Sequence, residues 1–287
     1  MRISVVLAVY NEEKNLKDCL NSLDDLAQEI VIVDGGSTDK TLEIAKQFNA
    51  KIIETSNPPI FHINKQKAMD AAEGDWVLQL DADERLSDLL RKEIEKVIEM
   101  NQEELEKYQN NLPSKNLFLR HQKLLEKRDG YIGTTEGGYA AFFVPRLNYF
   151  LGTYLKYGGV YPDGAIRLVK KNKAYFPCKS VHEQMVVDGK VGWLQNPMYH
   201  IDSPNFKRYL ERNLRYIKLI VRELQRDHVS KDPIQFINYC VVKPLWWFLI
   251  TLIRHKGILD GFPGIVFSFF SALRFPRAYI MYLLNQN

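Results

Sequence analysis

Cysteine is scarce in this chain, and positive charge exceeds negative charge only slightly. The three cysteines, Cys19, Cys178 and Cys240, are far apart and form neither a metal-knuckle spacing nor an even-numbered disulfide framework. A reducing compartment without disulfides is therefore expected. The formal net charge of +4 argues against a dedicated nucleic-acid binder, so no nucleic-acid partner is expected.

Long hydrophobic runs are also missing, and a leader sequence is not expected. No run of 18 apolar residues occurs, so a simple transmembrane helix is not expected. The closest approaches, residues 245–253 and 262–273, are predicted to be too short to span a bilayer. The strand-like start at Ile3–Val9 lacks the basic residues, longer apolar stretch and cleavage site of a signal peptide, so none is expected.

Short apolar segments alternate with helical patterns through the first third of the chain. The predicted strands are Ile3–Val9, 30–33, 51–53 and Trp76–Leu80. Helices are predicted between them, one with leucines 16, 20, 23 and 26 on one face and Asn11 as its cap, the other over residues 41–48. This order predicts an α/β fold with a mostly parallel sheet, in which ligands bind at the carboxyl ends of the strands.

The remainder of the chain is less regular. One acidic helix is predicted over residues 87–108, and Pro113, Ser114 and Gly130 indicate a loop-rich insertion at about 101–138. Irregular strands and loops are expected up to residue 203. From there, a long amphipathic helix and two interrupted apolar stretches predict a helical region over 204–287.

Two aspartates follow the last predicted strand. Asp81 and Asp83 project to the same side of an extended chain and converge at its carboxyl end. Carboxylates held together repel one another unless a cation lies near, and Mg²⁺ or Mn²⁺ bridged to nucleotide phosphates fits that place. A solvated acidic turn that caps the next helix is the alternative.

Asp34 ends the second predicted strand. A carboxylate there can accept hydrogen bonds from a ribose or a base edge, as in dinucleotide folds. The alternative is a helix cap or turn residue, although residues 37–39 offer Ser, Thr and Asp for that role. The G-x-G-x-x-G and Walker phosphate-binding fingerprints are both missing.

Several segments in a fixed order make the chain similar to a known family. Val-Tyr-Asn-Glu-Glu at 9–13, Val-Asp-Gly-Gly-Ser-Thr-Asp at 33–39 and Gly-Asp-Trp-Val-Leu-Gln-Leu-Asp-Ala-Asp-Glu-Arg at 74–85 resemble family 2 glycosyltransferases of the GT-A fold. Segments in the second half look like the subgroup that includes lipopolysaccharide core glucosyltransferases; they lie at 148–152, 161–163, 167–168, 181–183, 189–192 and 257–264. The resemblance covers nearly the whole chain except the insertion, and it implies that residues 1–203 form the catalytic domain.

The resemblance implies donor-binding roles. Tyr10, Asn11 and Glu12 would line a uracil and ribose pocket beside Asp34. Lys65 stands where the family usually has a polar or basic residue near the nucleotide; a surface lysine at the start of a helix is the alternative.

The same resemblance assigns the two aspartates. Asp81 would meet the ribose and the metal, and Asp83 would coordinate the metal, Mg²⁺ or Mn²⁺, through the diphosphate. His200 lies where many GT-A enzymes complete the coordination of the metal, and a neutral imidazole is a competent ligand. A packed or surface histidine is the alternative.

Glu183, in Val181-His182-Glu183, is the expected general base, because the family analogue of this position commonly has that role. An inverting transfer needs a base to take the proton of the acceptor hydroxyl. The alternative is a structural carboxylate that holds a loop to Arg167 or another cation, and His182 is expected to be a hydrogen-bonding neighbour. Arg167 would neutralise the leaving diphosphate, hold an acceptor phosphate, or form a fork with a structural carboxylate.

The tail combines aromatic residues with basic flanks. Residues 204–287 contain 13 Lys and Arg and 5 Asp and Glu, a net of +8, which leaves −4 for residues 1–203 out of the total of +4. This pattern predicts helices that lie in a membrane interface, at the cytoplasmic face of the cell membrane. The alternatives are packing on the catalytic domain or a dimer interface.

Together these features predict an inverting, metal-dependent glycosyltransferase. It would move a hexose from a nucleotide sugar, a UDP-sugar above all, to a glycolipid or polysaccharide acceptor. A catalytically degenerate scaffold that binds nucleotide sugar at the membrane is the non-enzyme alternative. A phosphotransferase or phosphatase is disfavoured, because its Asp-x-Asp pair normally ends the first strand of the fold.

Overall fold

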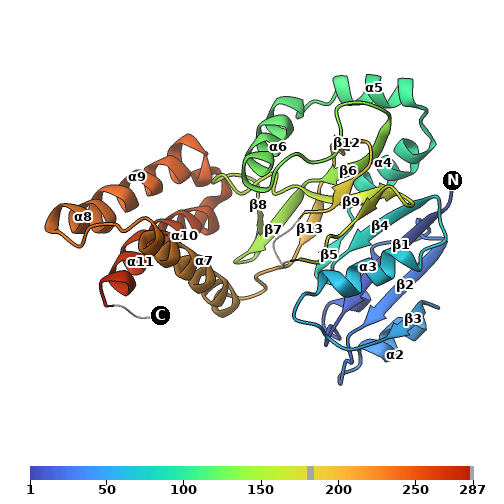
Figure 1. The fold of residues 1–287 in the computed structure, drawn as a ribbon, viewed down its shortest axis with the longest axis horizontal. Helices are drawn as coiled ribbons and strands as arrows, with labels where there is room; N and C mark the ends of the chain where they lie inside the picture. Colours follow the sequence, from blue (N-terminus) through green and yellow to red (C-terminus); the bar gives the residue numbers. More distant parts are fainter. Residues whose placement is uncertain (180–183, 285–287) are drawn as a thin grey trace. The chain divides into compact units, whose positions relative to one another are not determined.

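The computed structural model describes residues 1–179 and 184–284, and its chain divides into two compact units (Figure 1). The first unit consists of Met1–Arg146 and Pro162–His200, and the second of Leu147–Tyr161 and Ile201–Asn287. The second unit therefore includes a short segment of strands from the middle of the chain.

The first unit is built on a seven-stranded sheet in the order β12-β6-β9-β4-β1-β2-β3. Its strands are β1 (Ile3–Val9), β2 (Glu29–Asp34), β3 (Lys51–Glu54), β4 (Trp76–Leu80), β6 (Tyr139–Val144), β9 (Ala165–Lys170) and β12 (Lys190–Trp193). Only β9 is antiparallel to its neighbours, β4 and β6. The predicted α/β fold with a mostly parallel sheet is confirmed, and all four strands predicted at the start of the chain are present.

Helices follow the first strands as the apolar pattern predicts. They are α1 (Leu16–Asn21), α2 (Thr41–Gln47) and α3 (His62–Asp70). Leu16, Leu20, Leu23 and Leu26 are all buried in the main core. The prediction that Asn11 caps the first helix is wrong. Its side-chain oxygen instead accepts a hydrogen bond from the Thr38 N–H at 2.8 Å, and its backbone is left-handed, with φ of 55°.

The predicted single helix over residues 87–108 is two helices, α4 (Asp88–Glu99) and α5 (Gln102–Asn110). Asn101 and Glu104 form a capping box that starts α5. A capping box satisfies the free N–H groups of a new helix start, so a break here costs little.

The predicted loop-rich insertion is also wrong, since α5 and α6 (Lys115–Asp129) together make up most of it. Gly130, with φ of 91°, ends the helix, and Ser114 precedes it, so these residues mark boundaries. The Phe118 ring stacks on Trp193 at 4.6 Å. From α5, the side chain of Gln109 accepts a hydrogen bond from the Trp193 N–H at 2.9 Å and donates one to its carbonyl at 2.8 Å.

Short strands complete the first unit, as expected for residues 139–200. β5 (Glu84–Arg85) pairs antiparallel with β13 (Met198–His200), and β10 (Ala174–Tyr175) pairs antiparallel with β11 (Val186–Val187). The pairing of β5 with β13 joins the segment after β4 to the end of this unit.

The second unit combines a β-hairpin with helices. β7 (Arg146–Phe150) pairs antiparallel with β8 (Thr153–Leu155). The predicted amphipathic helix is α7 (Phe206–Arg226). It is followed by α8 (Pro233–Ile237), η1 (Asn238–Val242), α9 (Lys243–Leu249), η2 (Ile250–Arg254), η3 (Gly257–Asp260), α10 (Gly261–Ala272) and α11 (Arg274–Leu283).

The prediction that the apolar stretches of the tail are too short to span a bilayer is wrong. The short elements merge into two continuous helices, Pro233–Arg254 of 22 residues and Gly257–Leu283 of 27 residues, with mean hydropathies of 1.6 and 1.4. By length and composition both could cross a membrane. Pro244 and Pro263 lie in the first turns of α9 and α10, just after a π-helical and a 3-10 turn, where a missing N–H is tolerated.

Candidate active site

The carboxyl ends of β1, β2 and β4 meet at one edge of the sheet. β1 lies between the other two strands, with Val9 beside Asp34 and Leu7 beside Leu80. The segments that follow these strands hold the predicted donor-binding residues and the aspartate pair. The fold therefore brings together positions that are some 70 residues apart in the chain.

The segment after β1 is hydrogen-bonded to the turn after β2. The Asn11 N–H donates to Ser37 Oγ at 2.8 Å, and the Glu12 N–H donates to Thr41 Oγ1 at 2.7 Å. Burial raises the pKa of Glu12, although a hydrogen bond from Asn15 opposes the shift. Tyr10 is 46% exposed, so its ring faces solvent.

Asp34 is buried, and both of its oxygens are engaged by the turn that follows. Its Oδ2 accepts hydrogen bonds from the N–H groups of Gly36 and Ser37, both at 2.9 Å, and its Oδ1 accepts one from the Ser37 hydroxyl at 2.5 Å. In this conformation Asp34 holds the turn, which was the alternative interpretation of its position.

Asp81 lies between two buried cations. Its Oδ1 is 2.5 Å from the Lys65 ammonium, and its Oδ2 is 2.7 Å from the Arg167 guanidinium. Burial alone would raise the pKa of Asp81, but Arg167 and Lys65 hold that pKa well below its usual range. The Lys65 side chain is 8% exposed, so the alternative of a surface lysine is wrong. Burial lowers the pKa of Lys65, against the opposing effect of Asp81.

Glu84 completes this charge cluster through contacts with two arginines. Its side chain is fully buried and its Oε1 lies 2.7 Å from Arg167 and 3.5 Å from Arg146. Its other oxygen accepts a hydrogen bond from the Asp81 N–H at 3.0 Å. Arg146 also pairs with Asp163 at 3.0 Å. Arg167 therefore forms a fork with carboxylates, one of the three roles open to it from the sequence.

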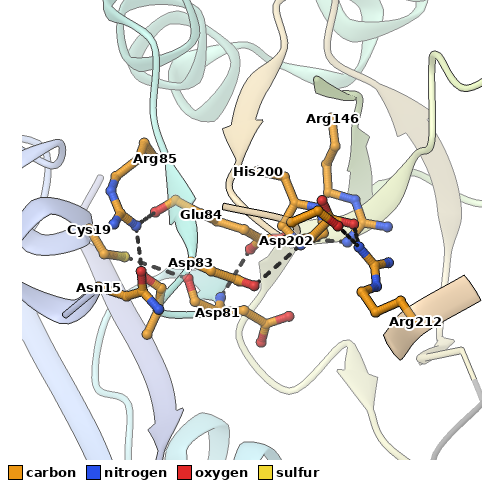
Figure 2. Close-up of polar contacts among 12 residues, drawn as sticks. Asn15, Cys19, Asp81, Asp83, Glu84, Arg85, Arg146, His200, Asp202 and Arg212 are labelled. Atoms are coloured by element: carbon orange, nitrogen blue, oxygen red, sulfur yellow. Dashed lines mark hydrogen bonds and ion pairs between the residues drawn. The ribbon is translucent and has the colours of Figure 1, made fainter. Parts of the chain in front are cut away.

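Asp83 points toward His200 (Figure 2). The His200 Nε2 and the Asp83 Oδ2 are 3.6 Å apart. The register of β5 with β13 places His200 beside Glu84, one residue from Asp83. Burial would raise the pKa of Asp83, but the hydrogen bond and charge of His200 hold it below its ordinary value.

Comparison with known proteins decides the family. The family model described as "Glycosyl transferase family 2" matches residues 4–143. A glycosyltransferase of Rickettsia bellii that has not been characterized is 34% identical over 288 residues, which cover 96% of this chain and 84% of that protein. The chain belongs to glycosyl transferase family 2.

Other matches differ in extent. A second uncharacterized glycosyltransferase, of Rickettsia typhi, is 27% identical over 301 residues, which cover all of this chain and 89% of that one. Among solved structures, glucosyl-3-phosphoglycerate synthase from Mycobacterium tuberculosis with Mn²⁺ and UDP is 30% identical, with a TM-score of 0.26. That match covers 29% of this chain and 34% of the synthase. Family membership makes this chain a glycosyltransferase with a nucleotide-sugar donor.

The possible metal ligands of this family 2 glycosyltransferase fit a divalent metal only in part. Within residues 1–179 and 184–284, no group of three or more His, Cys, Asp and Glu could enclose an ion. Asp83 and His200 nevertheless present one carboxylate oxygen and one imidazole nitrogen 3.6 Å apart. Mg²⁺ is commonly held by one or two carboxylates together with substrate phosphates and water. The pair therefore fits a metal that arrives with the diphosphate of a donor.

The predicted base of the glycosyltransferase, Glu183, and its neighbour His182 lie outside the described residues. The chain that leads to them is held by the helix that carries Lys65. The Phe176 N–H donates to the Gln66 side chain at 2.7 Å, and the Phe176 ring stacks on His62 at 4.6 Å.

Sequence reasoning missed Glu84 and Arg146 in this glycosyltransferase. Glu84 directly follows the Asp-x-Asp pair, where an acidic residue is expected to lie in a solvent-exposed turn. Its full burial depends on Arg146 and Arg167, which come from strands far along the chain. Its only signal in the sequence is a third acidic residue within four positions of the end of a mostly apolar strand.

Proposed function

We propose that this family 2 glycosyltransferase moves a hexose from a UDP-sugar, with inversion, to a lipid-linked or envelope glycan acceptor. The observation that carries the proposal is the pairing of Asp83 with His200 beside the Asp81 cluster, at the carboxyl edge of the sheet. This arrangement offers two ligands for a metal and two buried cations within one site.

The donor would bind across the edge formed by β1, β2 and β4. Tyr10, Asn11 and Glu12 would contact the uracil and ribose beside Asp34, for which the exposed ring of Tyr10 offers a stacking surface. Lys65 and Arg167, now paired with Asp81, would also oppose the charge of the diphosphate. Asp81 would keep both cations in place and accept hydrogen bonds from the ribose.

The departing diphosphate needs its charge stabilised. Asp83 and His200 would hold Mg²⁺ or Mn²⁺, which supplies Lewis-acid stabilisation of the leaving phosphate oxygens. The side chains of Lys65 and Arg167 act in the same direction from a site that water reaches poorly, where fixed charges are most effective.

Transfer with inversion is a single displacement. Glu183 would take the proton of the acceptor hydroxyl while that oxygen forms a bond to the anomeric carbon. The bond between the anomeric carbon and the diphosphate oxygen breaks at the same time, and UDP leaves with both electrons.

The acceptor and the location of the enzyme follow from the tail. Its net charge of +8 and its apolar helices favour a membrane that carries anionic headgroups, at the cytoplasmic face of the cell membrane. The resemblance to lipopolysaccharide core glucosyltransferases supports a glycolipid or polysaccharide acceptor.

The test measures UDP release from a panel of UDP-sugars with Mn²⁺, using the full chain. We expect turnover with one UDP-hexose and a loss of at least about 100-fold in Asp83→Asn, because one ligand of the metal is removed. Asp25→Asn is the control, since this exposed aspartate precedes β2 at the opposite edge of the sheet. Binding of UDP without turnover of any sugar would favour the degenerate scaffold, and full activity of Asp83→Asn would refute the metal site.

A further inference from the structure

The two apolar helices of the tail expose many large hydrophobic side chains. We call helices Pro233–Arg254 and Gly257–Leu283 the helical hairpin; only 6% and 22% of their most apolar windows are buried. The large apolar side chains exposed on the first helix are Ile234, Phe236, Ile237, Val241, Val242, Leu245, Trp246, Leu249 and Ile253. Ile258, Leu259, Phe262, Ile265, Phe269 and Ile280 are exposed on the second. We call these fifteen side chains the apolar face.

The contact between the two helices is made by small and polar residues. The Trp247 ring N–H donates to the Ser271 hydroxyl at 2.9 Å, and Ser268 and Thr251 are buried with their hydroxyls bonded to helix carbonyls. A Cβ on Gly257, at the start of the second helix, would lie 2.7 Å from the carbonyl oxygen of Thr251 in the first helix, so the two backbones approach closely there.

This distribution is the reverse of a water-soluble helix pair, which buries large apolar side chains and exposes polar ones. Helices in a lipid environment pack through small residues and side-chain hydrogen bonds, because lipid tails already solvate their apolar side chains. The hairpin therefore has the surface of a helix pair that faces hydrocarbon.

Basic residues flank the apolar face. Lys243 lies over the Tyr239 ring at 3.5 Å and Lys231 over the Tyr282 ring at 4.9 Å, while Arg254 and Lys256 stand at the turn between the helices. Ammonium and guanidinium groups at the border of an apolar surface match anionic lipid headgroups.

The position of helix α7 argues against a hairpin that spans the bilayer. It packs along the second helix, where Ile217, Val221 and Leu224 share a core with Tyr279 and Tyr282. Its sequence carries nine charged side chains, seven basic and two acidic. If the hairpin spanned the bilayer, α7 would be drawn with it, and its charged face would enter hydrocarbon at a cost of several kcal/mol.

We propose that the apolar face enters a single leaflet of an anionic membrane, with α7 remaining at the aqueous side, so that the hairpin anchors the enzyme without crossing the bilayer. This inference rests on the membrane part of the proposed function. It keeps the interfacial position predicted from the sequence although both helices are long enough to span, and it adds the side chains that contact lipid and the position of α7 on the aqueous side.

Vesicle binding tests the occupant of the apolar face. The full chain is sedimented with vesicles of phosphatidylcholine and phosphatidylglycerol in equal parts. We expect Trp246→Glu to lower the bound fraction at least about tenfold, since it places a charge in the centre of the apolar face. Leu89→Glu is the matched control, because Leu89 is 65% exposed and Trp246 is 64% exposed, and it should bind like the wild type.

Either of two results would overturn the inference. One is equal vesicle binding by wild type and Trp246→Glu. The other is no vesicle binding by wild type together with a dimer that Trp246→Glu dissociates, which would make a second copy of the chain the occupant.

Quenching of tryptophan fluorescence by brominated lipids tests how deeply the hairpin enters the bilayer. Trp246 lies near the middle of the first helix, with the partly buried Trp247 next to it, whereas Trp76 and Trp193 are buried in the core of the first unit. A one-sided anchor predicts the strongest quenching by lipids brominated near the headgroup, because an interfacial helix enters only about 5–10 Å. Strongest quenching by lipids brominated near the chain ends would show a spanning helix and refute the proposal. Trp246→Phe should leave only the weaker quenching of the partly buried Trp247.

Neither readout involves a sugar donor. Loss of UDP release with intact vesicle binding would therefore count against the proposed chemistry alone. Normal UDP release with absent or deep membrane insertion would count against the anchor alone.

Discussion

At the candidate site of the first unit, charged side chains contact groups of opposite charge: Glu84 meets two arginines, and Asp81 meets a lysine and an arginine. In the helical hairpin, Thr251, Ser268 and Ser271 bury uncharged hydroxyls, and many large apolar side chains are exposed. The first pattern suits a site that receives an anionic ligand from water. The second suits a surface that lies in lipid, so the difference indicates the solvent that each region meets.

The largest effect should follow from breaking the buried charge cluster. Glu84→Ala leaves Arg167 and Arg146 with fewer anionic partners in a buried place, so we expect a loss of about 3 kcal/mol in the free energy of unfolding. Glu95→Ala, which removes an exposed acidic side chain from α4, should change it by less than about 0.5 kcal/mol. Urea unfolding measures both, and equal stabilities would show that the cluster contributes nothing.

Removal of one cation from Asp81 should affect donor use more than stability. We expect Lys65→Met to lower kcat/KM for the donor roughly 10- to 100-fold, the range for a lost hydrogen bond to a charged group. Lys67→Met, on the same helix but bonded to Thr55 away from Asp81, is the control. Steady-state UDP release gives the comparison, and a normal KM and kcat in Lys65→Met would exclude Lys65 from the donor site.

A substitution at the contact between the two hairpin helices should lower stability and vesicle binding, whereas a substitution on the exposed surface of the hairpin should not. Gly257→Val places a side chain where the backbones of the two helices approach closely, so we expect a loss of about 1–3 kcal/mol in the free energy of unfolding and weaker vesicle binding. Ile258→Val, at the adjacent exposed position, should change neither. Circular dichroism during thermal unfolding reports the first quantity and sedimentation the second; an unaffected Gly257→Val would mean that the helices separate in the membrane.

The smallest effect is a pH dependence of the charge cluster. The pKa values of Asp81 and Asp83 are held below their ordinary values in the folded state. Their contribution to stability is therefore complete above the unfolded pKa of about 3.9, and it is lost as the pH falls through the lower folded values. Urea unfolding between about pH 6 and pH 3 should show a shallower decline for Asp81→Asn than for the wild type, whereas the exposed Asp25→Asn should keep the wild-type slope.

The central strands and the edge that holds the site could be predicted from the sequence, because short apolar runs ending in polar residues leave little choice of structure. Ile3–Val9 and Trp76–Leu80 are such runs, and both are strands. Asp81 and Asp83 follow the second run, so their place at the carboxyl edge was predictable. The partners of Asp81 were less so, since pairing with Arg167 depends on a distant antiparallel strand.

The errors came from residues whose meaning depends on position. Gly130 and Ser114 signal loops in general, but here they bound α6. Pro244 and Pro263 signal helix ends, yet they sit in first turns within longer helices. Composition alone does not distinguish a residue inside a loop from one at the boundary of a helix.

Gln109 has a consequence for the edge of the sheet. β12 is an edge strand of the seven-stranded sheet, and the backbone of an edge strand is open to pairing with another chain. At Trp193 the side-chain amide of Gln109 occupies the N–H and carbonyl that a further strand would use. One glutamine from the insertion thus imitates the peptide group of a neighbouring strand and protects the enzyme from aggregation through this edge.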